Sequence, residues 1–169
     1  TRKLTKTLRE KGAMLGKIIF ENDDINFYDP NAVDLVKEVT INEPIVYNDK
    51  PSQKKVVLID CGAKNNIIRN LIKRNLTVIR VPYNHDFLQQ FFDGIVISNG
   101  PGDPKMCKET IYNIGRVLKH EIPTFGICLG NQLLALAAGG DTYKLKYGHR
   151  SQNQPCTLAN TKRCFITTQ

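Results

Sequence analysis

The sequence predicts an α/β fold in which a mainly parallel β-sheet carries helices on both faces. Short, fully apolar segments alternate with segments whose apolar residues recur at helical spacing. Fully apolar strands are typical of parallel sheets, because helices cover both faces of such a sheet. Glycine-rich turns follow two of these segments, and sites in parallel sheets form at the carboxyl ends of the strands.

The first part of the chain shows weaker patterns. Residues 2–11 place Leu4 and Leu8 on one face of a predicted helix that ends at Gly12. Further along, we expect a strand at 17–20, a turn at 22–24 and a helix at 32–39. A polar stretch with two prolines follows, so we assign residues 1–45 to one domain, 46–55 to a linker and 56–169 to a second domain.

The second domain supplies the predicted sheet. Strands are expected at 56–60, 77–81, 94–98 and 122–125, and helices at 65–74, 108–119 and 131–138. Three later segments also have strand-forming composition: 143–147, 154–158 and 163–167.

Composition excludes several classes of protein. The 169 residues are 41% hydrophobic and 24% charged, as in a folded domain with a core. The net charge of +8 comes from dispersed residues without interleaved aromatics, so we expect no nucleic-acid partner. No apolar run approaches the ~20 residues of a membrane helix, so we expect no membrane partner. Because the chain lacks an initiator Met and ends abruptly at Gln169, we expect a fragment of a longer protein.

The five cysteines are odd in number and include no Cys-x-x-Cys pair. We therefore expect no disulfide framework and no zinc site. We therefore expect the protein to reside in a reducing compartment, the cytoplasm or alternatively the mitochondrion.

Cys128 is the candidate nucleophile. It lies between Gly126 and Gly130 where a predicted strand gives way to a helix, the layout of a nucleophile elbow. The glycines permit a sharp turn and close substrate approach, and the helix N-terminus favours a thiolate. A small cysteine packed in a strand-helix turn is the alternative.

A thiolate that attacks a carbonyl needs donors for the developing oxyanion. The N–H of Leu129, just after the nucleophile, is one candidate, and the loop from Gly100 to Gly102 can present a second. Gln132, one helical turn past Cys128, is expected to hydrogen-bond the substrate. The same glycine loop could instead cradle a phosphate, but no phosphate-binding glycine motif accompanies it.

These motifs resemble the glutaminase domain of carbamoyl-phosphate synthase, a class I glutamine amidotransferase. The resemblance is strongest to the eukaryotic, pyrimidine-pathway form and runs through the whole chain. It implies an incomplete class I amidotransferase sheet preceded by the tail of a small domain. The segments that carry it are residues 1–12, 98–104, 125–136, 142–144, 147–148 and 153–156.

The resemblance implies a role for each candidate residue. Cys128 would form a thioester with L-glutamine, and Gly100, Gly102, Leu129 and Gln132 would contact the glutamine or its oxyanion. The family's catalytic His and Glu would come from sequence beyond this chain. Released ammonia would pass to a synthetase portion, in the same polypeptide or a large subunit, that uses ATP and a divalent metal. No cofactor or metal is expected in this chain itself.

One departure from the family pattern is Asn131, where the family usually has His. Asn also occurs there in ammonia-dependent relatives, but those have lost the cysteine, so we interpret Asn131 as tolerated. Among the histidines, His120 is expected to be structural, and His85 to order a loop, with a catalytic base as its alternative. His149 lies in a polar loop, and Cys61 is expected to be a packing residue.

Two other functions stay open at this point. The chain could belong to another class I amidotransferase or a cysteine peptidase of related fold. It could also be a docking or regulatory module with an inactive site. Labelling of Cys128 by a glutamine-like electrophile would distinguish a working pocket from an inactive one.

Overall fold

The computed structural model describes residues 1–21, 25–89, 91–148 and 152–167. The chain divides into two units. One comprises Thr1–Phe27 with Tyr143–Gln169, and the other comprises Tyr28–Thr142. The predicted linker at 46–55 lies inside the second unit.

The second unit is built on a five-stranded sheet with the order β1-β3-β2-β4-β5. Strands β3, β2, β4 and β5 run parallel, and β1 pairs with β3 in the antiparallel direction. The predicted α/β class with a mostly parallel sheet is confirmed. The strands are Ile45–Tyr47 (β1), Lys55–Asp60 (β2), Thr77–Pro82 (β3), Gly94–Ile97 (β4) and Thr124–Gly126 (β5).

Strand β1 lies where we predicted the end of one domain and the start of a linker. It pairs at the sheet edge, with Ile45 opposite Arg80 and Tyr47 opposite Val78. Strand β1 has only three residues, and Val46 is 53% exposed. A segment this short does not show the apolar alternation by which a strand is recognised in a sequence.

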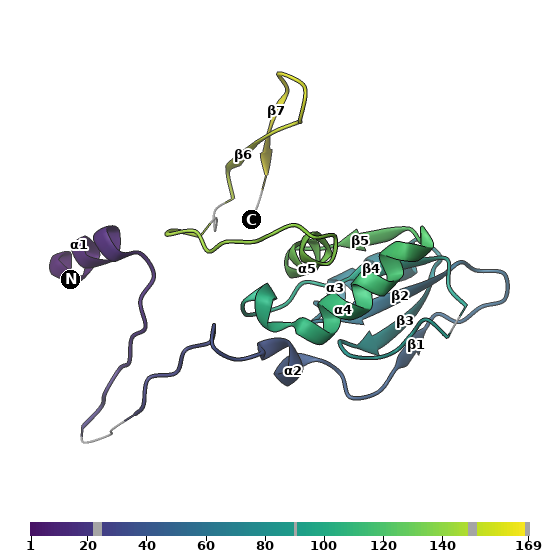
Figure 1. The fold of residues 1–169 in the computed structure, drawn as a ribbon, viewed down its shortest axis with the longest axis horizontal. Coiled ribbons are helices and arrows are strands. Elements are labelled where there is room, and N and C mark those ends of the chain that lie inside the picture. Colours follow the sequence, from purple (N-terminus) through teal and green to yellow (C-terminus); the bar gives the residue numbers. More distant parts are fainter. Residues whose placement is uncertain (22–24, 90, 149–151, 168–169) are drawn as a thin grey trace. The chain divides into compact units, whose positions relative to one another are not determined.

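Helices cover both faces of this sheet, as predicted. Helix α3 (Asn65–Lys73) packs on one face, and α4 (Lys108–Val117) and α5 (Leu129–Ala137) on the other (Figure 1). The alternation of side chains along each strand produces the two layers. In β2, Val57 and Ile59 face α4 and α5, whereas Val56 and Leu58 face α3.

The short helix α2 (Leu35–Val39) begins three residues later than the predicted helix 32–39. The Asp34 carboxylate caps it by accepting the N–H groups of Val36 (3.1 Å) and Lys37 (3.4 Å). Helix α4 is followed by a 3₁₀ turn, Leu118–His120, and another 3₁₀ turn, Pro104–Met106, precedes it.

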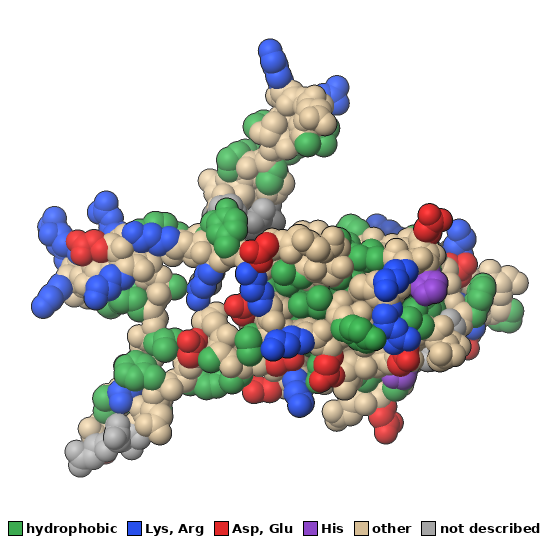
Figure 2. Space-filling view, viewed as in Figure 1, with side chains coloured by type: hydrophobic (Ala, Val, Ile, Leu, Met, Phe, Trp, Pro, Cys, Tyr) green, Lys and Arg blue, Asp and Glu red, His purple; other side chains and the backbone are tan. Residues whose placement is uncertain are grey.

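The first unit contains α1 (Arg2–Lys11) and an antiparallel hairpin of β6 (Gln154–Thr157) and β7 (Cys164–Thr167). These elements confirm the predicted helix 2–11 and strands 154–158 and 163–167. Lys and Arg side chains gather around α1 (Figure 2). None of the described helices is both long and apolar enough to cross a membrane.

Two predicted strands of this unit are wrong. Residues 17–20 and 143–147 are not in strands, and neither segment pairs with another among the described residues. Ile18 is 91% exposed and Tyr143 is 84% exposed, so their apolar character does not reflect burial in a sheet. The predicted turn at 22–24 lies outside the described residues.

Candidate active site

Cys128 lies at a sharp turn between β5 and α5, as the sequence predicted. Its φ of 54° and ψ of −110° form a conformation that residues with a side chain rarely adopt. Two backbone hydrogen bonds fasten the turn to β4. The Ile127 N–H donates to the Ile97 carbonyl (2.9 Å), and the Gly130 N–H donates to the Ser98 carbonyl (3.1 Å). The neighbouring strand therefore holds the strained backbone in place.

Glycine is required on both sides of Cys128. A Cβ atom at Gly130 would lie 2.3 Å from the Ile97 carbonyl oxygen. One at Gly126 would lie 2.6 Å from the backbone nitrogen of Asn131. No side chain fits at these distances, so the turn can be this tight only with a glycine at each position.

The loop after β4 lies directly against the first residue of α5. A Cβ atom at Gly100 would be 2.2 Å from the Cys61 carbonyl oxygen and 2.6 Å from Leu129 Cδ2. Gly102 has a φ of 87°, which favours glycine. This contact brings the two segments that the sequence proposed for oxyanion binding to one place.

Two backbone donors in these segments have no hydrogen-bond acceptor among the described residues. The N–H groups of Gly100 and Leu129 donate to no acceptor within the described part of the chain. Cys128 is exposed, whereas the Leu129 side chain is 2% exposed and anchors the start of α5 in the core. An exposed sulfur can form a thioester, and unpaired N–H groups, one at the start of α5 and one in the adjoining loop, can stabilise an oxyanion.

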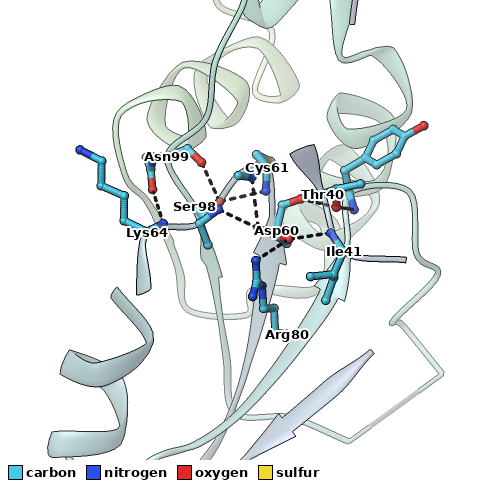
Figure 3. A network of polar contacts seen from close by, with 11 residues as sticks. Thr40, Ile41, Asp60, Cys61, Lys64, Arg80, Ser98 and Asn99 are labelled. Atoms are coloured by element: carbon cyan, nitrogen blue, oxygen red, sulfur yellow. Dashed lines mark hydrogen bonds and ion pairs between the residues drawn. The ribbon is translucent and has the colours of Figure 1, made fainter. Parts of the chain in front are cut away.

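A buried carboxylate, Asp60, fixes the turn between β2 and α3 (Figure 3). This turn contacts the loop after β4, because the Cys61 carbonyl lies against Gly100. Asp60 is fully buried and pairs with Arg80 at 2.9 Å. It also accepts the N–H groups of Gly62 (3.1 Å), Ala63 (2.7 Å) and Ile41 (2.8 Å). These bonds compensate the cost of burying the charge and hold the segment after β2 in one conformation.

Cys128 borders a cavity of about 1010 Å³ beside α3 and β5. Val96, Phe125 and Ile127 give it an apolar wall on the sheet side. None of the described residues that line it is a histidine or a carboxylate. Its other lining residues are Lys64, Asn66, Ile67, Asn70, Leu71, Arg74, Asn99, Gly100 and Pro101.

The predicted site residues are only partly brought together. Gly100 and Cys128 line the cavity, and Leu129 contacts the Gly100 position. Gly102 and Gln132 are absent from the lining, and the Gln132 side chain is exposed on α5. Their contact with glutamine therefore stays a prediction.

A polar row along α3 and its C-cap residue Arg74 was missed in the sequence. Asn66, Asn70 and Arg74 face the cavity at four-residue intervals, the spacing of neighbours on one helix face. The Arg74 guanidinium donates to the Asn70 carbonyl (3.0 Å) and to its side-chain oxygen (3.3 Å). That spacing was visible in the sequence, but only the fold shows that this face borders Cys128.

Neither described histidine lines the cavity. His120 is exposed in the 3₁₀ turn at the end of α4, and its structural role stays a prediction. His85 follows β3, and its backbone N–H donates to the Pro82 carbonyl at 3.1 Å. His149 lies outside the described residues.

Cys61 and Cys107 differ from Cys128 because both are buried. Burial raises the pKa of the Cys61 thiol far above its ordinary value. Burial and the nearby Asp34 carboxylate raise the pKa of Cys107 to about 12. Both thiols therefore stay protonated at neutral pH, and the predicted packing role of Cys61 agrees with its complete burial.

Comparison with known families agrees with this geometry. Residues 57–169 match the family described as glutamine amidotransferase class-I. The chain belongs to this family. A solved structure from Thermoplasma acidophilum, described as a component of GMP synthase, has a similar fold, with a TM-score of 0.55 and 24% identity. The match covers 62% of this amidotransferase chain and 54% of the other.

Several curated relatives align with the whole amidotransferase chain. The multifunctional protein CAD of Squalus acanthias is 50% identical, and the human mitochondrial carbamoyl-phosphate synthase [ammonia] is 47% identical. The arginine-specific small chain of carbamoyl phosphate synthase from Chaetomium globosum is 45% identical. The chain spans 8%, 11% and 38% of these three proteins, respectively.

Proposed function

We propose that this chain carries the nucleophile of the glutamine-hydrolysing part of a carbamoyl-phosphate synthase. The observation that carries the proposal is the exposed, strained Cys128 beside the free N–H groups of Gly100 and Leu129. Similarity to carbamoyl-phosphate synthases along the full chain supports this choice over other amidotransferases.

In the proposed reaction, the Cys128 sulfur attacks the side-chain amide carbon of L-glutamine. The carbonyl oxygen becomes an oxyanion that accepts hydrogen bonds from Leu129 and Gly100. The carbon–nitrogen bond then breaks, and the nitrogen takes a proton and leaves as ammonia. Water hydrolyses the resulting thioester to glutamate and restores the thiol. Gly102 and Gln132 would contact the bound glutamine.

The proton transfers require a base, and no histidine or carboxylate is found among the described lining residues. We propose that a His and a Glu elsewhere in the full-length protein supply this function. Ammonia would then reach a synthetase portion that uses ATP and a divalent metal. That portion would lie in the same polypeptide or in a large subunit.

The product would feed pyrimidine or arginine synthesis, because the relatives include CAD and an arginine-specific small chain. We propose a cytoplasmic location, with the mitochondrion as the alternative, because one relative is named mitochondrial. Of the predicted division into residues 1–45, 46–55 and 56–169, we keep the start of the last domain, whereas residues 45–47 form an edge strand of its sheet. The family match from residue 57 supports its last boundary.

Replacing Cys128 in the full-length protein tests this function. Cys128→Ser should abolish glutamine-dependent carbamoyl phosphate synthesis while synthesis from added ammonia continues, because only the first step needs the thiol. The matched control is Cys156→Ser, which alters an exposed cysteine of β6 and should leave both activities unchanged. Intact glutamine-dependent synthesis in Cys128→Ser would refute the proposal.

A further inference from the structure

Ser98 connects the nucleophile turn to the loop that carries Gly100. Its side chain is fully buried at the end of β4. The hydroxyl accepts the Cys61 N–H at 2.9 Å and donates to the Asn99 carbonyl at 2.8 Å (Figure 3). Its own carbonyl accepts the Gly130 N–H at 3.1 Å. One residue therefore contacts both segments that would supply the oxyanion donors.

The next two residues fasten the loop to the β2–α3 turn as well. The Asn99 side-chain oxygen accepts the Lys64 N–H at 3.1 Å (Figure 3). Gly100 then lies so close to the Cys61 carbonyl that no Cβ atom fits there. The position of the Gly100 N–H is thus set by contacts to a turn that is itself fixed by Asp60.

We infer that Ser98 is a positioning residue. It holds the Gly100 loop so that the Gly100 N–H can reach an oxyanion formed at the Cys128 sulfur. This inference rests on the proposed function. Ser98→Ala removes both hydrogen bonds of the hydroxyl, yet the bond from Gly130 to the Ser98 carbonyl remains. The change therefore loosens the Gly100 loop and leaves the cysteine turn in place.

The test measures two reactions of Cys128 in the full-length protein. Glutamine hydrolysis needs both oxyanion donors in position, and small displacements of catalytic groups cost up to about 10²-fold in rate. Alkylation by iodoacetamide displaces iodide from carbon and forms no oxyanion. In Ser98→Ala we expect kcat for glutamine to fall about 10- to 100-fold. The KM should change far less, and the alkylation rate of Cys128 should match the wild type.

Two further variants make the test decisive. Thr110→Val removes another fully buried hydroxyl, on α4, which has no hydrogen-bond partner in the described structure. It should leave kcat unchanged. If Ser98→Ala does not fold, Asn99→Ala takes its place, because Asn99 is only half-buried and its loss removes the second anchor of the same loop.

The inference is overturned if the folded variant keeps a kcat within about twofold of the wild type. It is also overturned if alkylation of Cys128 slows by the same factor as kcat, because Ser98 would then act on the cysteine turn. The Cys128→Ser variant separates the two proposals. Retained hydrolysis in Cys128→Ser refutes the proposed function, whereas its loss together with full activity in Ser98→Ala refutes only the role of Ser98.

Discussion

The five cysteines occupy different environments, and this difference sets their reactivity. Cys61 and Cys107 are buried, whereas Cys128, Cys156 and Cys164 are exposed. Of the exposed thiols, Cys128 lies at a helix N-terminus and the other two lie in strands. The sulfurs of Cys156 and Cys164 each lie within hydrogen-bond distance of a threonine hydroxyl across the hairpin, at 3.4 and 3.3 Å, whereas Cys128 borders the cavity.

We therefore expect Cys128 to be alkylated first and Cys61 and Cys107 last at neutral pH. Competitive labelling of the folded protein with limiting iodoacetamide, followed by peptide mapping, measures this order. Labelling after unfolding in denaturant is the control, because it should remove the differences. Earlier labelling of Cys61 than of Cys128 would refute the assignment of the nucleophile.

Cys107 also makes stability depend on pH. Its pKa is about 12 in the folded chain, whereas an unfolded thiol titrates near ~8.5. Between these values the unfolded state releases a proton that the folded state retains, so stability falls as pH rises. The contribution reaches about 1.4 kcal/mol per pH unit at most.

The expected result is a shallower loss of unfolding free energy with pH in Cys107→Ala than in the wild type. Urea unfolding between about pH 9 and 11 measures the slope. Cys156→Ala, which removes an exposed thiol, should keep the wild-type slope. Equal slopes in the wild type and Cys107→Ala would show that the buried thiol does not control this dependence.

At the scale of elements, the junction between β4 and α5 depends on one glycine. Gly130→Ala would place a Cβ atom 2.3 Å from the Ile97 carbonyl, so the helix must move away from the strand. We expect a loss of about 1–3 kcal/mol in unfolding free energy, the usual cost of overpacking, together with lost glutamine hydrolysis.

The matched control is Gly115→Ala, within α4. A Cβ atom there meets only the Ala137 carbonyl, at an ordinary 3.8 Å. Alanine is the better helix former, so this variant should gain about 0.5–1 kcal/mol. Denaturant unfolding of both variants measures the difference. A Gly130→Ala protein as stable as Gly115→Ala would contradict the close packing at the elbow.

The sequence correctly predicted those elements whose apolar residues are in fact buried in the folded chain. The interior of β2 (residues 56–59) and strand β4 are apolar because both faces are covered, and the elbow is visible because its glycines are a local backbone requirement. The apolar residues of 17–20 and 143–147 gave false strands, because apolar composition does not supply a pairing partner. Conversely, β1 forms because β3 offers it an edge, which no local pattern reveals.

The same distinction applies to the candidate site. The nucleophile and the Gly100 loop could be found as motifs. The roles of Asp60 and Ser98 could not, because each has a partner about 20 to 40 residues away in sequence, Ile41 for Asp60 and Cys61 for Ser98. The α3 face that borders the cavity became identifiable only once β5 was placed at the edge of the sheet.

At the scale of the whole molecule, the parallel sheet gathers three turns at one edge. These turns follow β2, β4 and β5 and contain Cys61, Gly100 and Cys128. In the proposed reaction these turns would supply the thiol and two oxyanion donors, whereas no histidine or carboxylate is among the described residues that line the cavity. We therefore propose that the nucleophile and the oxyanion site are assembled within this unit, separately from the base that the proposed reaction needs.

This separation predicts how the 169-residue chain behaves alone. Without a base, attack by the thiol and proton transfer to the leaving ammonia are both slow, and general acid–base catalysis is worth about 10²–10⁴-fold. We expect the isolated chain to hydrolyse glutamine at least about 10²-fold more slowly than the full-length protein. Ammonia release measured for both proteins at equal concentration tests this, with full-length Cys128→Ser as the baseline.

Alkylation of Cys128 by iodoacetamide should persist in the isolated chain, because it needs neither the base nor the oxyanion donors. Turnover of glutamine by the isolated chain at the full-length rate would mean that its own residues complete the site.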